Sequence, residues 1–298
     1  MGAITKIAWC DSTWNPIRGC TRISHGCDHC YAEAMSHRNP AALGEWGAEG
    51  RRSVGVESYW NQPLRWEREA ADAGVIRRVF VPSLGDFFEG EHQDGRELRL
   101  GPRPDYLPLL ARYRAIAART PHLRYLNLTK RPWNMLIYAR EHGWPSNWWA
   151  GCTVEDQERA DTRIPFLVDV PAPVLFLSME PLLERVNLRA VGAGGLRLDA
   201  LSGCWRVADI DEGCDRAVDW LIVGGESGPG ARPFGVEWAR ELVGEAKYSG
   251  VACFVKQLGA DPRISGGRRM VLRHPKGGDP DEWPPDLRVR AFPADRSP

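Results

Sequence analysis

The sequence has no excess of charge of either sign. Its 298 residues hold 39 Lys and Arg against 39 Asp and Glu, so the formal net charge is zero. A chain without net positive charge has no general attraction for polyanions, which excludes a histone-like coat for nucleic acid. Charged residues make up 26% and hydrophobic residues 43%, which suffices for a sizeable core and excludes wholesale disorder.

A long apolar run is also missing. No stretch approaches the roughly 20 apolar residues that a membrane-spanning helix needs. The first residues, MGAITKIAWCDSTWNP, lack the apolar core of a signal peptide. We therefore expect a cytoplasmic protein with no membrane partner, whose cysteines stay reduced.

Short apolar runs, rich in β-branched and aromatic residues, recur along the chain and predict buried strands. Stretches with helical spacing lie between several of them, and such alternation predicts an α/β fold with a parallel sheet. Six or seven strand–helix units fit a complete or incomplete (β/α) barrel. After an extended segment at 13–18, the predicted strands are 79–83, 125–129, 148–152, 174–178, 220–224 and 251–255, and the predicted helices are 104–119, 156–168 and 236–248.

Three segments interrupt this alternation. Residues 39–68, rich in Gly, Trp and Arg, predict an insertion after the first helix. Residues 189–218, with a glycine cluster and two cysteines, predict an irregular or hairpin insertion. Residues 259–298 are rich in Pro, Gly and Arg and predict a loosely ordered tail. The chain shows no internal repeat and no Gly/Ser linker. It therefore favours one catalytic domain with insertions, which spans residues 1–258, rather than two independent domains.

Three of the eight cysteines, Cys20, Cys27 and Cys30, fall within eleven residues, directly after the extended segment. A disulfide is disfavoured in a reducing compartment and would leave one thiol over. A [4Fe–4S] cluster on three cysteines leaves one iron open for a substrate or cofactor. A structural zinc normally takes four ligands, of which the fourth could be His25, His29 or His37. Spacing alone leaves zinc and iron–sulfur nearly level.

The other five cysteines are interpreted as packing residues. Cys10, Cys152 and Cys253 each lie in an apolar setting that suits a buried thiol. Cys204 and Cys214, in the second insertion, could form a second metal site or a hairpin pair. With only two ligands visible, the sequence favours an ordinary structural role for them.

Charged residues follow successive predicted strands. In a parallel α/β barrel the carboxyl ends of the strands form the rim where ligands bind. One such charge would be an ordinary solvated loop residue, but charges after so many strands favour a shared site. Lysine is scarce, with 5 Lys against 34 Arg, which draws attention to the two lysines in the set. The set comprises Asp86, Lys130, Arg131, Glu155, Glu180, Glu226 and Lys256.

Several segments together resemble a phage- and bacteria-associated family that is related to radical S-adenosylmethionine (SAM) enzymes. They cover most of residues 10–259 and are specific in combination. The cysteine loop keeps the two-residue gap of radical SAM enzymes between Cys27 and Cys30, whereas six residues separate Cys20 from Cys27. Other matching motifs are LTKRP at 128–132, GCTVED at 151–156, SMEPLL at 178–183, GGESGPGARP at 224–233 and VKQLG at 255–259.

The resemblance implies a partial (β/α) barrel of the radical SAM type with insertions. It implies that Cys20, Cys27 and Cys30 hold a [4Fe–4S] cluster and that SAM chelates the open iron. Reduction, by a partner such as flavodoxin or ferredoxin, would cleave SAM to methionine and a 5′-deoxyadenosyl radical that abstracts hydrogen from a substrate. The cofactor does the hard chemistry while the protein positions it.

Matching strand ends to that class implies further roles. Ser83 and Asp86 would bind the methionine amine, because a carboxylate suits an ammonium group. Lys130 and Arg131, with Thr129 beside them, would hold the methionine carboxylate. The remaining assignments are Thr153 and Glu155 for ribose hydroxyls, and Lys256 for substrate or proton transfer. Four further residues are candidates for SAM or substrate: Ser178, Glu180, Glu226 and Ser227. Of all these, Lys256 and Glu226 are the predicted catalytic residues.

Tryptophan and arginine alternate in residues 51–66 and 131–149, a combination typical of sites that stack single-stranded or flipped bases. Trp148 and Trp149 are expected to pack the barrel, so the insertion at 39–68 is the better candidate substrate surface. With the phage association and a broad similarity to spore photoproduct lyase, this predicts a nucleobase or nucleic-acid substrate. Two alternatives stay open: a zinc-stabilised nucleic-acid-binding module without catalysis, and a barrel hydrolase using Glu226 and Lys256.

Overall fold

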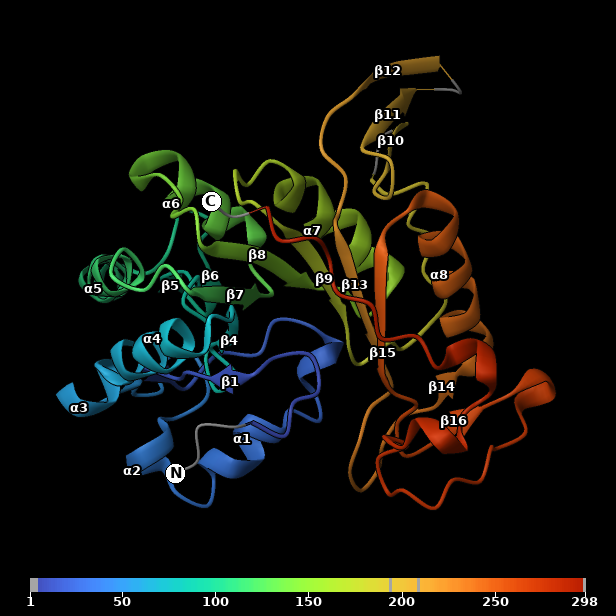
Figure 1. Cartoon of the computed structure of the whole chain (residues 1–298), viewed down its shortest axis with the longest axis horizontal. Helices are drawn as coiled ribbons and strands as arrows, with labels where there is room; N and C mark the ends of the chain where they lie inside the picture. The colour runs from blue at the N-terminus through green and yellow to red at the C-terminus, as the bar shows by residue number, and fades with distance from the viewer. Residues whose placement is uncertain (1–4, 193–194, 208–209, 297–298) are drawn as a thin grey trace. The chain divides into compact units, whose positions relative to one another are not determined.

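The computed structural model describes residues 5–192, 195–207 and 210–296, which form a mixed α/β fold (Figure 1). Its main sheet has seven strands in the order β1-β4-β7-β8-β9-β13-β15, which is also their order along the chain. The α/β class predicted from strand–helix alternation is confirmed. The strands are β1 Ser12–Thr13, β4 Arg77–Val81, β7 Leu123–Thr129, β8 Trp148–Thr153, β9 Leu175–Met179, β13 Trp220–Gly224 and β15 Ala252–Gln257.

The chain divides into two compact units, which are described separately. The first comprises residues 1–151, 170–173 and 296–298, and the second comprises residues 152–169 and 174–295. Within the first unit β1 pairs with β4 and β4 with β7, both in parallel. Within the second unit β13 lies between β9 and β15 and is parallel to both.

Helices precede the strands of the first unit. Helix α4 (Gln62–Ala73) precedes β4, α5 (Leu107–Ala117) precedes β7 and α6 (Pro132–His142) precedes β8. Helix α4 ends at Gly74, whose φ of 63° is the left-handed conformation that glycine adopts without steric cost. Short elements complete this unit: α1 Tyr31–Ser36, α2 Pro40–Leu43, α3 Glu57–Trp60, and the antiparallel pairs β2 Ile17–Arg18 with β3 Ser53–Val54 and β5 His92–Gln93 with β6 Arg96–Glu97.

Aromatic side chains fill the core of the first unit. The ring centroid of Tyr113 lies 4.1 Å from that of Trp148 and 5.0 Å from that of Trp14. Trp60 and Trp66 are 0% and 2% exposed. The expectation that residues 39–68 present stacking tryptophans to a substrate is therefore wrong for these two, because their apolar surface packs the core.

The second unit continues the alternation of helices and strands. Helix α7 (Gln157–Val168) begins after Asp156, whose carboxylate caps it by accepting from Arg159 N at 2.8 Å. Helix α8 (Val236–Ser249) buries Leu242 and Ala246 and contacts β13 and β15 (Figure 1). The three helices predicted from periodicity are confirmed, each within a few residues.

The segment after β15, predicted as a loosely ordered tail, makes hydrogen bonds within the second unit. Strand β16 (Pro262–Arg263) pairs with β14 (Phe234–Gly235). Further on, the chain lies along β15, where Val255 N donates to Val289 O at 2.8 Å and Ala291 N donates to Cys253 O at 2.9 Å (red in Figure 1). The side chains of Trp283 and Leu287 in this segment are buried.

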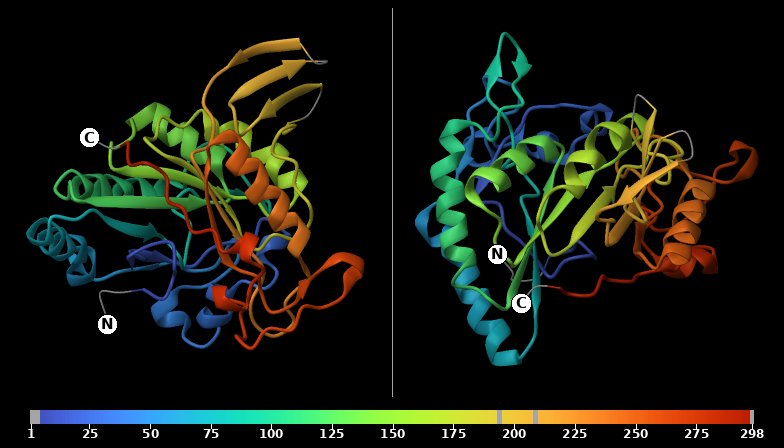
Figure 2. Two further views of the ribbon diagram at one scale, coloured as in Figure 1. Left: turned by 45° about the vertical axis from the view of Figure 1, so that its right-hand side comes forward. Right: turned by 90° about the horizontal axis from the view of Figure 1, so that it is seen from above.

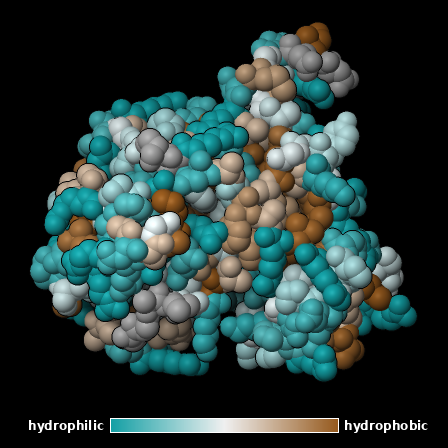
Figure 3. All heavy atoms as spheres, viewed as in Figure 1, coloured by the Kyte–Doolittle hydropathy of each residue, from teal (hydrophilic) through white to brown (hydrophobic). Residues whose placement is uncertain are grey.

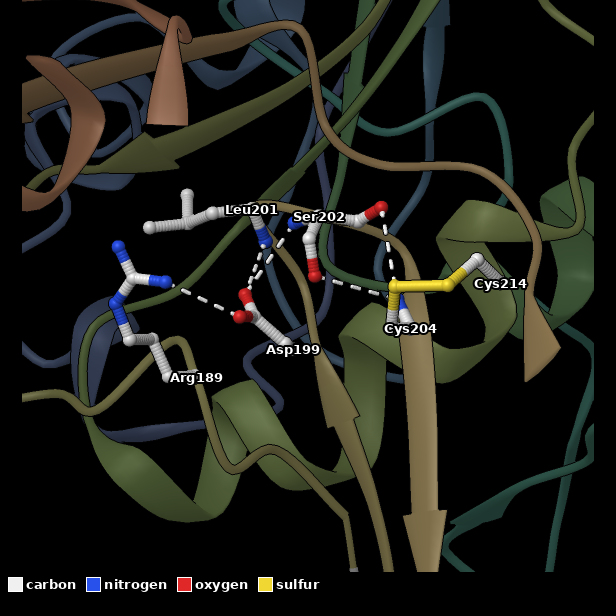
Figure 4. The surroundings of a disulfide bond; sticks show 6 residues. All are labelled: Arg189, Asp199, Leu201, Ser202, Cys204 and Cys214. Carbon is white, nitrogen blue, oxygen red and sulfur yellow. Dashed lines mark hydrogen bonds and ion pairs between the residues drawn. A yellow bond between two sulfur atoms is a disulfide. The ribbon is translucent and has the colours of Figure 1, made fainter. Parts of the chain in front are cut away.

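The insertion predicted at 189–218 forms a three-stranded antiparallel sheet of β10 (Leu196–Asp199), β11 (Cys204–Val207) and β12 (Ile210–Cys214), seen in Figure 2. Register places Cys204 opposite Cys214, and the two form a disulfide (Figure 4). This is the hairpin pair that the sequence left open as an alternative, and the interpretation of Cys204 and Cys214 as packing residues is wrong. Two residues 10 apart meet because the hairpin folds one onto the other.

Apolar side chains are exposed on this small sheet. Leu196, Val207 and Ile210 are register neighbours across the three strands and are 40%, 40% and 66% exposed. Figure 3 shows a mostly hydrophilic face, with hydrophobic side chains at the outer end of the sheet at the top. Over the described part of the chain, no helix has the length and apolar character needed to cross a membrane.

Candidate functional site

The three-cysteine loop lies in the first unit, between β2 and α1. Gly19 precedes Cys20 with a φ of 97°, and a Cβ there would come within 2.7 Å of the Glu45 carbonyl oxygen, so glycine is required. Helix α1 begins at the residue after Cys30. Cys20, Cys27 and Cys30 form no disulfide, and all three are half-buried.

Two arginines hold the Cys20 end of the loop. Arg131 Nη1 donates to Cys20 Sγ at 3.7 Å, and its Nη2 donates to the carbonyl oxygen of Thr21 at 2.9 Å. Arg52 Nη2 donates to Thr21 Oγ1 at 2.8 Å. Burial raises the pKa of the Cys20 thiol above its ordinary value, and the charge of Arg131 acts in the opposite direction.

These arginines belong to a buried network of charges. Arg131 lies 2.6 Å from Glu97 and 3.1 Å from Asp86, and the Arg52–Glu89 pair is separated by 2.6 Å. Burial alone would raise the pKa of Glu89, but the Arg52 hydrogen bond and the charges of both arginines outweigh it and lower that pKa. Pairing of this kind is what makes buried charges tolerable.

The loop is also tied at its other end. Tyr31, directly after Cys30, donates its hydroxyl to the carbonyl oxygen of Ser83 at 2.8 Å. Arg22 Nε donates to Glu33 of α1 at 2.7 Å. The segment that carries Cys27 is thus held between two fixed ends.

The residues predicted to bind methionine gather beside the loop. Asp86 follows β4, is 4% exposed and accepts from Thr129 Oγ1 at 2.8 Å, from Lys130 N at 3.3 Å and from Arg131. Ser83, at the end of β4, donates its backbone N–H to Asn15 Oδ1 at 2.6 Å. The structure thus brings these side chains together, but it already pairs Asp86 and Arg131 with protein groups. Binding of SAM by those two residues remains a prediction that would require them to exchange partners.

The three cysteines of the loop have the donor atoms that a cluster needs, but their side chains are not arranged around a common point. Within residues 5–192, 195–207 and 210–296, no three His, Cys, Asp or Glu side chains are arranged to hold an ion. Three cysteines outside a disulfide on one short loop are nevertheless the ligands that iron–sulfur clusters take. His25, a predicted fourth zinc ligand, faces Asp28 Oδ2 through its Nδ1 at 3.3 Å. Binding of an iron–sulfur cluster or of zinc by this loop stays a prediction.

In the second unit, Thr153 is the last residue of β8 and Glu155 follows it, and both contact Arg163 of helix α7. The Glu155 side chain is fully buried and lies 2.7 Å from Arg163 Nη1, which also donates to the carbonyl oxygen of Thr153 at 2.8 Å. A carboxylate so enclosed serves the packing of α7 against the end of β8. The predicted contact with ribose remains a prediction, and it would require this pair to open.

Glu180 and Lys256 form an ion pair across the end of β13. Lys256 Nζ lies 2.5 Å from Glu180 Oε1, with side chains 21% and 17% exposed. A Cβ on Gly224, which ends β13 between their strands, would come within 3.3 Å of Glu180 Cγ. Because glycine has no Cβ, Gly224 leaves room for the Glu180–Lys256 pair. The nearby Ser178 side chain is buried.

Glu226 is held by the glycine-rich loop that contains it. Its carboxylate accepts from Arg232 Nη2 at 2.6 Å and from Arg232 N at 2.9 Å. A Cβ on Gly225 would come within 2.6 Å of the Leu258 carbonyl oxygen, so the loop packs tightly against the chain after β15. The bidentate pair with Arg232 stabilises the loop, and a catalytic role for Glu226 remains a prediction.

Sequence reasoning missed the charged partners of the predicted residues. Arg52, Glu89, Glu97 and Arg163 carry no motif spacing that separates them from surface charges. The signal available for Arg52 was its place in the stretch 51–66, where Trp and Arg alternate. The short β5–β6 hairpin that delivers Glu97 was also missed, because its strands are two residues each.

Comparison with known proteins identifies a family to which the chain is similar. A family model described as protein of unknown function (DUF5131) matches residues 4–276. The match contains the cysteine loop, the buried charge network and β15, and it ends before the segment that lies along β15. No curated protein and no solved structure matches the chain.

Proposed function

The chain therefore belongs to that family of proteins of unknown function, and from this premise we propose that it is a radical SAM enzyme acting on a nucleobase or nucleic acid. The observation that carries the proposal is the loop that holds three cysteines outside a disulfide, Cys20, Cys27 and Cys30. The loop comes after β1 and β2 in the chain, and the predicted SAM ligands in the same unit lie at or just after the ends of β4 and β7. These are the carboxyl ends of parallel strands, where α/β proteins bind ligands.

A partial (β/α) barrel of the radical SAM type is the fold that accompanies this proposal. The seven strands follow chain order, and the first and last of them, β1 and β15, are the two edge strands of the sheet. This topology agrees with a barrel that does not close. The antiparallel sheet β10–β12 then corresponds to an insertion.

The cysteines would hold a [4Fe–4S] cluster and leave one iron for SAM. When bound and reduced, this group supplies the cleavage of SAM to methionine and a 5′-deoxyadenosyl radical. The chain's part is to orient the thiols, to bind SAM and substrate, and to exclude water. Arg131 and Arg52 fix the Cys20 end, and Ser83, Asp86, Thr129 and Lys130 offer polar groups for SAM.

The proposal requires a one-electron donor of the flavodoxin or ferredoxin class and a cytoplasmic setting where such donors work. In the second unit, the partly exposed Lys256 holds a transferable proton at Nζ, beside the Glu180 carboxylate. We propose that Lys256 and Glu180 contact the substrate rather than SAM. The nucleic-acid part of the proposal is supported by the resemblance described above and is tested by comparing host and phage nucleosides, by mass spectrometry, with and without the gene.

Anaerobic purification is expected to yield brown protein with about four iron atoms per chain, as a [4Fe–4S] cluster requires. Dithionite and SAM should then release 5′-deoxyadenosine, measured by chromatography. Protein incubated with SAM but without dithionite is the control and should release none. Colourless protein with stoichiometric zinc would contradict the proposal and favour a zinc-stabilised binding module.

Replacing Lys256 by methionine is expected to leave iron content and substrate-free SAM cleavage unchanged and to lower substrate turnover by about 10²–10⁴-fold, the usual worth of a positioned proton donor. The pair is partly exposed, so the loss of stability should stay within about 1 kcal/mol. Product and 5′-deoxyadenosine are measured in the same reaction. Lys247→Met, an exposed lysine of α8, is the matched control, and equal turnover in both variants would remove Lys256 from the mechanism.

A further inference from the structure

The sulfur of Cys20 has a specific neighbour. Arg131 Nη1 lies 3.7 Å from Cys20 Sγ and 3.1 Å from Asp86 Oδ2, while its Nη2 reaches the carbonyl oxygen of Thr21. One guanidinium thus contacts both the thiol and the backbone of the residue that follows it. This geometry fixes the direction in which the sulfur points.

Arg131 cannot readily turn away from the sulfur. Its side chain is 1% exposed, and its Nε donates to both carboxylate oxygens of Glu97, at 2.7 and 2.6 Å. Asp86 holds the opposite side and is itself held by Thr129. Rotating the guanidinium would leave two carboxylates buried without their partner, which is strongly unfavourable.

We propose that Arg131 is the positioning residue of the Cys20 ligand and that its hydrogen bond to the sulfur raises the reduction potential of the cluster. The inference rests on the proposed function, because it needs the cluster to be present. Reduction adds one electron, supplied by the reductase, and therefore adds negative charge. A donated N–H and a nearby positive charge stabilise that reduced form, and hydrogen bonds to the sulfurs are among the features that set such potentials.

Arg52 provides a matched comparison on the same loop. It is also buried, with a side chain 4% exposed, and it pairs with Glu89 at 2.6 Å. Its contact with the loop is to the hydroxyl of Thr21 at 2.8 Å, one residue beyond the ligand. A change that merely loosens the loop should affect both arginines alike, whereas tuning of the sulfur should be specific to Arg131.

The test compares Arg131→Lys with Arg52→Lys in the anaerobically purified full chain. Both variants keep their charge and lose the planar fork. The midpoint potential is measured by spectroelectrochemical titration, together with iron content, the electron paramagnetic resonance spectrum and the thermal unfolding midpoint. We expect Arg131→Lys to make one-electron reduction at least about tenfold less favourable, which is about 59 mV. Arg52→Lys should leave the potential near that of the wild type.

A second measurement needs no variant. Wild-type protein labelled with ¹⁵N only at arginine should show a nitrogen hyperfine coupling to the reduced cluster in pulsed paramagnetic resonance. Absence of this coupling, or equal potential shifts in the two variants, overturns the role of Arg131 while the proposed function stands. Wild-type protein that binds no iron overturns both.

Discussion

Replacing Cys27 by alanine is expected to reduce the iron content from about four atoms per chain to background and to abolish SAM cleavage, because a [4Fe–4S] cluster with an open iron has only three protein ligands to begin with. The same loss is expected for Cys20→Ala and Cys30→Ala. Iron is measured by a chelator assay on anaerobically purified protein, and 5′-deoxyadenosine is measured after reduction.

The matched control is Cys253→Ala, which removes a free thiol that is buried in β15. This variant should keep its iron and its SAM cleavage, although loss of a buried side chain costs some stability. Thermal unfolding of the iron-free proteins separates ligand loss from misfolding, since the loop thiols are only half-buried. Iron retained at wild-type level in any of the three loop variants would contradict the assignment of that cysteine.

Replacing Arg163 by methionine is expected to lower the free energy of unfolding by about 3–5 kcal/mol, the usual cost of leaving a buried charge without its partner. Glu155 has a fully buried side chain, and the guanidinium of Arg163 lies 2.7 Å from it. Arg163 also donates to the carbonyl oxygen of Thr153, so the variant loses a second buried hydrogen bond. Urea denaturation followed by circular dichroism measures the loss.

A second substitution tests the cause of this destabilisation. In Arg163→Met with Glu155→Gln the stranded charge is gone, and much of the lost stability should return. Arg185→Met breaks an exposed pair with Glu241 and should cost at most about 1 kcal/mol. If Arg163→Met costs no more than Arg185→Met, the buried pair contributes nothing and the account of this strand end is wrong.

Local patterns in the sequence predicted the main elements of the fold. The run at 220–224 forms β13, and the helical spacing at 236–248 forms α8, because each buries a face that its own periodicity reveals. Tryptophans were harder to place. Trp60 and Trp66 alternate with arginines as stacking residues do, yet they are buried, and the sequence does not show which face of α3 and α4 meets the core.

Pairings between distant residues could not be predicted. Arg52 and Glu89 are 37 residues apart, and only the folded chain makes them neighbours. The cysteine loop could be found because its three cysteines are close in sequence, whereas the partners of Arg131 come from distant parts of the chain. Cys204 and Cys214 meet because of the register in which β11 and β12 pair.

The segment that lies along β15 bears on aggregation of this protein. An edge strand with unpaired N–H and C=O groups is a template on which other chains can add strands. The hydrogen bonds of Val289 and Ala291 to β15 occupy that template from within the same molecule. The residues that make these hydrogen bonds lie beyond residues 4–276, the region that matches the family model. Shortened or tagged forms of the chain should therefore keep residues 284–291 intact, because residues of this segment occupy the free edge of β15.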